Sequence, residues 1–370
     1  MAPKRPTGAG ALLKTVESSA PKPPDSSELY AALDLGTNSC RMLIAQPKGN
    51  QFHVVDSFSK SVQLGSGLES TRRLSRGSMR RTIQALRICQ QKLKRHKVKR
   101  MRLVATEACR RARNAREFIG QVKRETGLQL EIIEPQEEAR LAVISCAPLV
   151  SVNTDQLLVV DIGGGSTELV WIDLSAVPHA ERPRSIMRLH SGFHSVASPF
   201  PAPKVVDWIS VPLGVATLRD QFCDVEDDSA RFALMSWFFE ENLSEFAPYK
   251  DIPKSEGFQI VGTSGTVTTV AASHLGLRRY DRTKVDGLRM TSDQIDKVIR
   301  RYLELGPKGR RMDPRIGQDR QALIMSGSAI LQTLMRCWPT NRLSVADRGL
   351  REGLLYAQMS MDGVLEDAPF

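Results

Sequence analysis

The amino-acid sequence contains one strand–turn–strand pattern twice. In each copy an apolar run reaches an aspartate, a glycine-containing turn with small polar residues follows, and a second apolar run returns. The two copies are LYAALDLGTNSCRMLIAQ, residues 29–46, and LLVVDIGGGSTELVWIDL, residues 157–174. Because strand, turn and return strand all match, the repeat indicates two related domains that face each other. Strands alternate with helical segments through both halves, which predicts an α/β fold.

The turns of this repeat predict phosphate binding. Three consecutive glycines form the second turn, and each costs about 0.5–1 kcal/mol relative to alanine in ordered structure. Successive free backbone amides in such turns make a concave site for anions, and a tight hairpin without a ligand is the alternative. A third turn leads from a strand into a helix, whose N-terminus attracts anions. The residues predicted to hold phosphate in the three turns are Gly36, Thr37, Asn38, Ser39, Gly163, Gly164, Gly165, Ser166, Gly262, Ser264, Gly265 and Thr266.

Two aspartates, Asp34 and Asp161, stand at the ends of the first strands of the repeat. A carboxylate beside a phosphate-binding turn suits Mg²⁺, which keeps several waters and takes one or two carboxylates. The sequence has neither the Gly-x4-Gly-Lys-Ser/Thr motif nor a strand that leads into Gly-x-Gly-x-x-Gly. A P-loop NTPase and a dinucleotide-binding enzyme are therefore poor interpretations.

Positive charge is concentrated in one stretch. Residues 72–124 hold nineteen lysines and arginines against two acids, a net charge of +17, whereas the whole chain carries +11. Such a stretch can be a solvated helix surface, but this density favours a polyanionic partner. Phe118 is its one aromatic residue, so it lacks a platform on which bases could stack, and nucleic acid is not an expected partner.

The rest of the chain predicts a cytoplasmic protein without a membrane span, because no apolar run is long enough to cross a bilayer. Six scattered cysteines predict reduced thiols. We expect a disordered tail over residues 1–28 and a first domain over 29–136, to which a helix in 351–370 returns. The second domain is expected over 137–350, with an insert near 179–208. His190 and His194 in this insert support a metal site only weakly, since no third ligand is near them in the sequence.

Six segments carry a family resemblance: DLGTNSCRMLI, EEARLAVIS, VVDIGGGSTELV, VPLGVATLRDQF, GTSGTVTTVAA and LSVADRGLREGLL. In this order and spacing they resemble the exopolyphosphatase/guanosine pentaphosphate phosphatase family, over residues 30–355. The resemblance implies the fold of actin, sugar kinases and Hsp70, with two ribonuclease-H-like domains around a central cleft. It also implies a homodimer, and a short-form member without a C-terminal His-Asp domain.

The resemblance assigns roles to single residues. Glu138 matches the general base that activates water, although an acid in a first helical turn also has a purely structural explanation. Asp161 and Glu168 match acids that position metal and water, and Asp34 joins them as a metal ligand. Arg41 and Arg110 match phosphate-contacting arginines. The chain departs from many members at Gln63, where they carry arginine.

The function expected from these residues is processive, Mg²⁺-dependent hydrolysis of terminal phosphate from inorganic polyphosphate. A guanosine pentaphosphate 5′-phosphohydrolase, acting on guanosine pentaphosphate or tetraphosphate, is the closest alternative, and Arg278 or Tyr280 could stack on its base. A polyphosphate-dependent nucleotide kinase and a non-catalytic polyphosphate sensor are the remaining alternatives.

Overall fold

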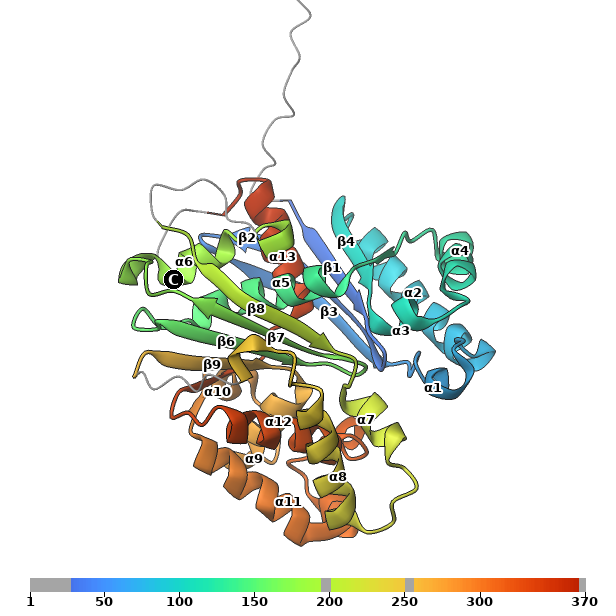
Figure 1. The fold of residues 1–370 in the computed structure, drawn as a ribbon. Helices are drawn as coiled ribbons and strands as arrows, with labels where there is room; N and C mark the ends of the chain where they lie inside the picture. The colour runs from blue at the N-terminus through green and yellow to red at the C-terminus, as the bar shows by residue number, and fades with distance from the viewer. Residues whose placement is uncertain (1–27, 194–200, 250–255, 366–370) are drawn as a thin grey trace, which may run out of the picture.

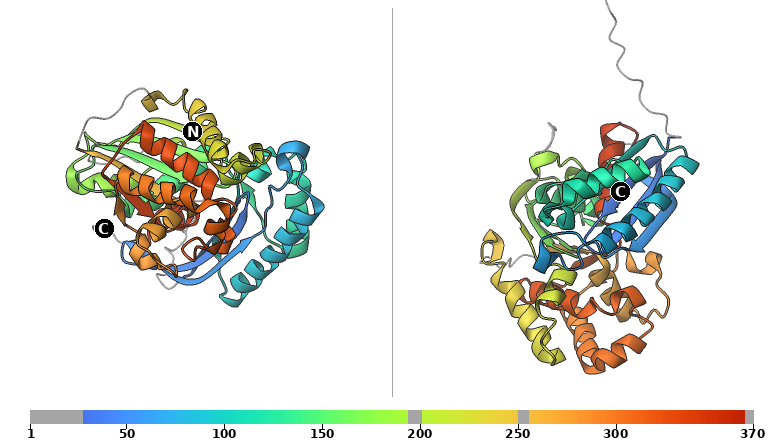
Figure 2. Two further views of the ribbon diagram at one scale, coloured as in Figure 1. Left: turned by 90° about the horizontal axis from the view of Figure 1, so that it is seen from below. Right: turned by 90° about the vertical axis from the view of Figure 1, so that its right-hand side faces the viewer.

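The computed structural model describes residues 28–193, 201–249 and 256–365. Apart from Glu28, the predicted tail lies outside these residues, as does His194. Two mixed sheets organise the described chain, and the N-terminal elements (blue to cyan) and the C-terminal helices (orange) lie in different halves of the molecule (Figures 1 and 2). The predicted α/β fold is confirmed.

The first sheet has five strands in the order β3-β2-β1-β4-β5. Their bounds are β1 Tyr30–Leu35, β2 Ser39–Lys48, β3 Gln51–Ser61, β4 Arg100–Ala105 and β5 Glu131–Ile132. Strand β1 pairs antiparallel with β2 and parallel with β4. Helices α2 (Arg76–Arg95) and α4 (Ala115–Thr126) contribute to the apolar core on one face, and α13 (Leu350–Met361) covers the other.

The second sheet has six strands in the order β10-β11-β9-β6-β7-β8. Their bounds are β6 Gln156–Ile162, β7 Thr167–Asp173, β8 Lys204–Val211, β9 Phe258–Thr263, β10 Arg289–Met290 and β11 Leu343–Ala346. One face packs against α8 (Asp228–Glu241), α9 (Gly265–His274), α11 (Ser292–Met312) and α12 (Ile324–Cys337), and the other against α5 (Pro135–Cys146) and α6 (Arg182–Met187). Short helices complete the fold: α1 (Leu68–Thr71), α3 (Glu107–Arg111), α7 (Val215–Gln221) and α10 (Arg282–Val285).

The internal repeat is visible as two matching hairpins, β1–β2 and β6–β7. Asp34 pairs with Arg41 in the first, and Asp161 pairs with Glu168 in the second. Both turns close with the same backbone bond, Gly36 N to Ser39 O at 3.0 Å and Gly163 N to Ser166 O at 2.9 Å. Each sheet therefore presents one of the turns predicted to bind phosphate, called phosphate-type turns below, at the carboxyl end of its first strand.

The two halves meet through α5 and α13, which pack against each other between the sheets. At Gly353 a Cβ atom would lie 2.0 Å from the carbonyl oxygen of Leu141, so the two backbones touch. The helix from residue 350 thus packs on β1 and β2 while its neighbour α5 packs on the second sheet. The predicted division at residue 137 remains a prediction; β5 ends at Ile132 and β6 begins at Gln156.

The helical segment that follows β4 is divided in two. The segment from Ala108 to Val122 forms parts of α3 and α4, with a break at Ala112–Asn114. Asn114 accounts for the break, because its side chain accepts from Leu74 N at 2.8 Å and donates to Leu74 O at 3.0 Å. None of the helices in the described segments is long and apolar enough to cross a bilayer.

Candidate active site

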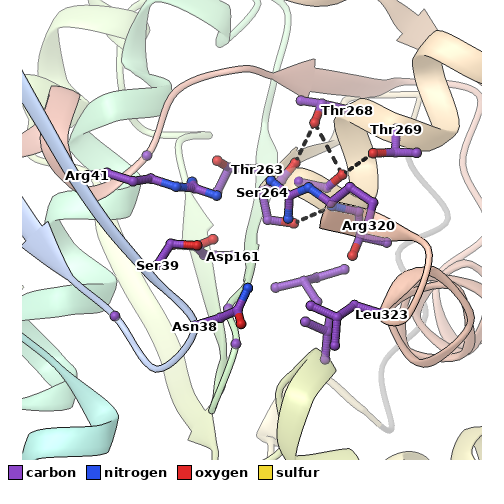
Figure 3. Close-up of a pocket in the computed structure, with 18 of the residues that line it drawn as sticks. Asn38, Ser39, Arg41, Asp161, Thr263, Ser264, Thr268, Thr269, Arg320 and Leu323 are labelled. Carbon is purple, nitrogen blue, oxygen red and sulfur yellow. Dashed lines mark hydrogen bonds between the residues drawn. The ribbon is translucent and has the colours of Figure 1, made fainter. Parts of the chain in front are cut away.

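A cavity of about 590 Å³ lies between the two halves of the molecule. Figure 3 shows Asn38, Ser39 and Arg41 on one wall and Ser264, Thr268 and Arg320 on the other, with Asp161 between them. Most of the predicted site residues line it: Asp34, Gly36, Thr37, Asn38, Ser39, Arg41, Glu138, Asp161, Gly163, Gly164, Gly165, Ser166, Ser264, Gly265 and Thr266. Three predicted residues, Arg110, Glu168 and Gly262, do not line the cavity.

The turns of the two hairpins meet at one wall of the cavity. Within the described chain, the N–H groups of Thr37, Asn38, Gly164 and Gly165 have no hydrogen-bond acceptor. The hydroxyl of Thr37 is buried and also lacks a partner among these residues. A Cβ on Gly165 would lie 2.5 Å from that hydroxyl, so only glycine fits where the turns meet. The arrangement offers several unused donors to an anion.

The third phosphate-type turn enters α9. Ser264 has a φ of 108°, and its hydroxyl accepts from Thr266 N at 3.3 Å at the start of the helix. A Cβ on Gly265 would lie 2.0 Å from Cζ of Arg320, so the guanidinium lies directly over this glycine. Gly262 lies inside β9, where a Cβ would stand 3.2 Å from the side chain of Val267. Glycine at this position allows β9 and α9 to pack closely, and it does not line the cavity as a phosphate contact would.

Four carboxylates surround the inner end of the cavity. Asp34 and Asp161 are half-buried on its wall, and Glu138 is buried on its wall. Glu168 is 2% exposed, lies behind the wall, and accepts from the Ser210 hydroxyl at 2.8 Å. In the described residues no three His, Cys, Asp or Glu side chains are placed to hold a metal ion by themselves. The assignment of Asp34, Asp161 and Glu168 as metal ligands remains a prediction.

Burial and mutual repulsion raise the pKa values of these acids. Burial first, and then the charge of Glu168, raise the pKa of Glu138 to about 8, while Arg110 opposes the shift. Burial, followed by Glu138 and Asp34, raises the pKa of Asp161 to about 7. Burial and then Asp161 raise the pKa of Glu168 to about 7. Clustered acids with raised pKa values are typical of catalytic sites.

Arg110 holds Glu138 from behind. Its Nη1 donates to Glu138 Oε2 at 2.7 Å and to the carbonyl of Ile133 at 2.8 Å, and its Nη2 donates to Glu107 Oε2 at 3.0 Å. The three hydrogen-bond acceptors of this guanidinium are therefore protein atoms, and Arg110 is not among the residues that line the cavity. Arg110 thus orients Glu138 from behind the cavity wall.

Replacing Arg110 with glutamine should move the acid limb of the pH profile of kcat/KM toward higher pH. Arg110 lowers the pKa of Glu138, so its loss raises a pKa that already lies above the usual range, and the ionised base then forms only at higher pH. An opposite charge at this distance is worth about one pH unit or more. Rates of phosphate release measured from pH 5.5 to 9.5 test this, and Arg110→Lys should shift the midpoint less. An unchanged midpoint in Arg110→Gln would contradict the assignment of Glu138 as the titrating group.

Several arginines that line the cavity were not predicted from the sequence. Arg315, Arg320, Arg348 and Arg351 line the cavity together with Arg41. Burial lowers the pKa of Arg41, and the nearby Arg351 lowers it further. Arg348 and Arg351 lie in the LSVADRGLREGLL segment, whose conspicuous charges after a strand are the signal that could have identified them.

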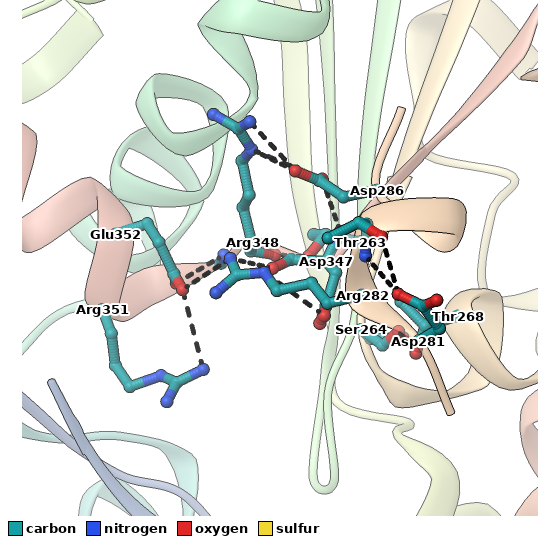
Figure 4. A network of polar contacts seen from close by, with 12 residues as sticks. Thr263, Ser264, Thr268, Asp281, Arg282, Asp286, Asp347, Arg348, Arg351 and Glu352 are labelled. Atoms are coloured by element: carbon teal, nitrogen blue, oxygen red, sulfur yellow. Dashed lines mark hydrogen bonds and ion pairs between the residues drawn. The ribbon is translucent and has the colours of Figure 1, made fainter. Parts of the chain in front are cut away.

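A polar network holds this segment in place. Arg348 pairs with Asp286 at 2.9 Å, and Arg282 Nη2 donates to the carbonyl of Asp347 at 2.6 Å (Figure 4). Glu352 Oε2 accepts from Gly349 N at 3.0 Å and so caps α13. The start of α13 is therefore anchored to the second half of the molecule, while its body packs on the first sheet.

Gln63 and the insert lie away from the main cavity. Gln63 has a φ of 48° and lines a smaller cavity beside Thr37 and Asn38. The described part of the insert includes α6, whose Ile186 packs in the same apolar cluster as α5. Arg140 of α5 donates to the carbonyl of Leu189 at 2.7 Å. This part of the insert covers α5 and does not line the cavity.

The fold and the site define a class: an α/β protein of two halves, with glycine-rich turns suited to phosphate and a buried glutamate in the cleft between them. Comparison with known families agrees. The model of the Ppx/GppA phosphatase family matches residues 43–361, and the chain belongs to this family.

Individual relatives are similar over most of the chain. A guanosine-5′-triphosphate,3′-diphosphate pyrophosphatase of Aeromonas salmonicida is 29% identical over 331 residues, covering 90% of this chain and 59% of the relative. The chain thus spans less than two thirds of that relative's length. The crystal structure of the Aquifex aeolicus Ppx/GppA family member is 30% identical, covers 90% of this chain and 98% of its own, and has a TM-score of 0.70. An exopolyphosphatase of Cytophaga hutchinsonii, 21% identical over 92% of this chain and 100% of its own, shares the fold with a TM-score of 0.74.

Proposed function

We propose that this protein is an exopolyphosphatase, which removes terminal phosphate from inorganic polyphosphate. The observation that carries the proposal is a buried glutamate, Glu138, with its pKa raised to about 8, on the wall of a cavity that three phosphate-type turns share. Membership of a phosphatase family supports hydrolysis. We also expect a homodimer in the cytoplasm, and these remain predictions.

The proposed reaction uses Glu138 as the base. Its carboxylate takes a proton from water, the oxygen of that water attacks the terminal phosphorus, and the phosphoanhydride bond breaks. The products are inorganic phosphate and a chain shorter by one unit. The free amides of Thr37, Asn38, Gly164 and Gly165 bind the phosphate oxygens, and Arg41 with Arg351 offsets their negative charge.

The residues present fit Mg²⁺ held largely through water. Asp34 and Asp161 are the two carboxylates that end the first strands and line the cavity, and the unpartnered Thr37 hydroxyl lies in the same pocket. Two carboxylates with water is the set that Mg²⁺ accepts. Bound there, the ion would supply positive charge to the phosphoryl group. Glu168 would act behind Asp161, by raising the pKa of Glu138 and contacting Ser210.

Guanosine pentaphosphate is the second candidate substrate. Tyr280 is 49% exposed and lines the cavity with Ala272 and Leu277, which together give an apolar patch for a base. Arg315 lies on the same wall, but its guanidinium is paired with Asp313 at 2.7 Å. Arg278 is not among the lining residues.

A polyphosphate-dependent nucleotide kinase is less well supported. The base Glu138 favours water over a nucleotide as the acceptor of the phosphoryl group.

Phosphate release measured side by side on long-chain polyphosphate and guanosine pentaphosphate tests the proposal. We expect release from polyphosphate with Mg²⁺, and loss of release when the ion is removed with a chelator. Release from guanosine pentaphosphate alone would replace the proposed function by the second candidate. Binding of polyphosphate without release from either substrate would indicate a sensor.

A further inference from the structure

A second, smaller cavity of about 90 Å³ adjoins the main one. Thr37, Asn38, Glu107 and Gly165 line both, so the two share the phosphate-type turns as a common wall. The first half of the molecule also contributes Gln63, Gly65, Ser66, Leu68, Glu69, Ala108 and Arg111 to the smaller cavity. From the second half, α7 contributes Ala216, Thr217, Arg219 and Asp220. The cleft therefore continues past the phosphate turns, between α1 and α7.

Ion pairs flank this continuation. Arg111 donates through both terminal nitrogens to Glu69, at 2.6 and 2.7 Å. On the opposite side, Arg219 Nε donates to Asp220 Oδ1 at 2.8 Å. These side chains are partly exposed, and a phosphate oxygen can replace a carboxylate as the partner of a guanidinium.

Beyond the Arg111–Glu69 pair lies a cluster of arginines, Arg72, Arg73 and Arg113, which we call the arginine cluster. The chain holds it together, because Arg113 N donates to the carbonyl of Arg72 at 2.9 Å and Asn114 bonds to both backbone groups of Leu74. All three side chains are exposed, and none has a carboxylate partner within the described residues.

Several other cations of the same stretch are paired with carboxylates. Arg100 pairs with Glu28 and Asp362, and Arg102 pairs with Glu131 and Glu137. Lys92 pairs with Asp56 at 2.7 Å. On the wide side of the main cavity, Arg315 is paired with Asp313 and Arg348 with Asp286. The arginine cluster thus adds exposed positive charge on the side of the smaller cavity, beyond the arginines that line the main one.

We propose that long polyphosphate leaves the active site through the smaller cavity, between α1 and α7, and continues over the arginine cluster. This inference rests on the proposed function and deepens it: the substrate is a linear polyanion whose terminal phosphate lies at Glu138 and whose distal phosphates bind Arg72, Arg73 and Arg113. A triphosphate, held by the turns alone, does not reach the cluster. The cluster therefore gives a preference for long chains.

The experiment compares Arg72→Gln/Arg73→Gln/Arg113→Gln with a matched control, Lys94→Gln/Arg95→Gln/Lys97→Gln. The control removes three exposed cations from the same basic stretch, at the other end of α2, which is roughly 30 Å away at 1.5 Å per residue. Neither set belongs to the proposed catalytic machinery. Phosphate release is measured for long-chain polyphosphate and tripolyphosphate, each over a series of salt concentrations.

We expect the cluster variant to lose about tenfold or more in kcat/KM for long-chain polyphosphate, with tripolyphosphate unchanged. The slope of log kcat/KM against log salt concentration should become shallower by about 1 to 3, at about 0.9 per phosphate contact by analogy with duplex DNA. The control should change neither value. Equal losses in both variants, or equal losses on both substrates, would overturn the path.

Other outcomes are equally decisive. If the parent protein releases phosphate from neither substrate, the proposed function fails and the path with it. If the parent is active and the cluster variant keeps its preference for long chains, the path alone is wrong. Loss of single-stranded DNA binding in the cluster variant, with an unchanged ratio of the two polyphosphate activities, would assign the cluster to nucleic acid and overturn the proposal.

Discussion

Replacing Glu138 with glutamine should lower kcat for phosphate release by about 10²–10⁴-fold, the usual contribution of a general base. Glutamine keeps the shape of the side chain and still accepts a hydrogen bond from Arg110, but it cannot take a proton from water. Binding of polyphosphate should be retained, since the turns and the cavity arginines are unchanged. Steady-state phosphate release and a separate binding measurement check the two statements.

The neighbouring glutamate offers a matched control. Glu137 lies one residue earlier in α5, does not line the cavity, and pairs instead with Arg102 at 2.9 Å and Arg140 at 2.7 Å. Glu137→Gln should therefore leave kcat within a few-fold of the parent. If Glu138→Gln retained a tenth or more of the parent rate, Glu138 would not be the base. Lost binding in the same variant would indicate a structural role.

The turns of the site could be predicted because their chemistry is local. A run such as Gly163–Gly165 after an apolar strand predicts an exposed backbone wherever it occurs, and the repeat predicted that two such turns face each other. The hairpins bear this out, with Asp34 and Asp161 at equivalent positions. The position of Glu138 in the first turn of a helix was also readable, although only the resemblance suggested that it faces the cleft.

The site residues whose positions could not be predicted from the sequence are placed by contacts between segments far apart in the chain. Arg110 is adjacent to Arg111 in sequence, yet the first binds Glu138 and the second binds Glu69. Glu168 is paired with Asp161 across β6 and β7 but bonds to Ser210 of β8, and Gly262 packs against Val267, so neither lines the cavity. Arg320 reaches Gly265 from a segment 55 residues later, and no local pattern specifies that contact.

The α/β fold class could be predicted from the sequence, whereas the helices that cover the sheets could be predicted only in part. Alternation of strands and helices predicts the α/β architecture, and the apolar residues of Ser75–His96 recur at helical spacing, in agreement with α2. The interruption at Ala112–Asn114 could not be predicted, because the bond between Asn114 and Leu74 joins residues 40 positions apart. Helix α8 carries apolar residues around most of its surface, so periodicity does not identify it.

Replacing Gly353 with alanine should destabilise the protein and disturb the site together. The new Cβ would lie 2.0 Å from the carbonyl oxygen of Leu141, and a backbone atom cannot move aside as a flexible side chain can. Helices α5 and α13 must separate, at a cost of about 1–3 kcal/mol or more for overpacking. Because the Tm of domains of 150–250 residues shifts by roughly 2–4 °C per kcal/mol, the loss in Tm should be on the order of 2–12 °C. Thermal unfolding measured by circular dichroism checks this value.

Activity should fall with stability in Gly353→Ala, because each of the two helices brings a residue to the cavity. Helix α5 carries Glu138 and α13 carries Arg351 in its first turn, so a change in their separation moves the base relative to the arginine proposed to bind phosphate. Gly120→Ala in α4 is the control: its Cβ would meet only the end of the Arg124 side chain at 3.4 Å, and alanine favours a helix by about 0.5–1 kcal/mol. We expect that variant to be as stable as the parent or more so, with unchanged activity. If both alanine variants kept the parent Tm, the contact between α5 and α13 would not be the joint that holds the two halves of the site together.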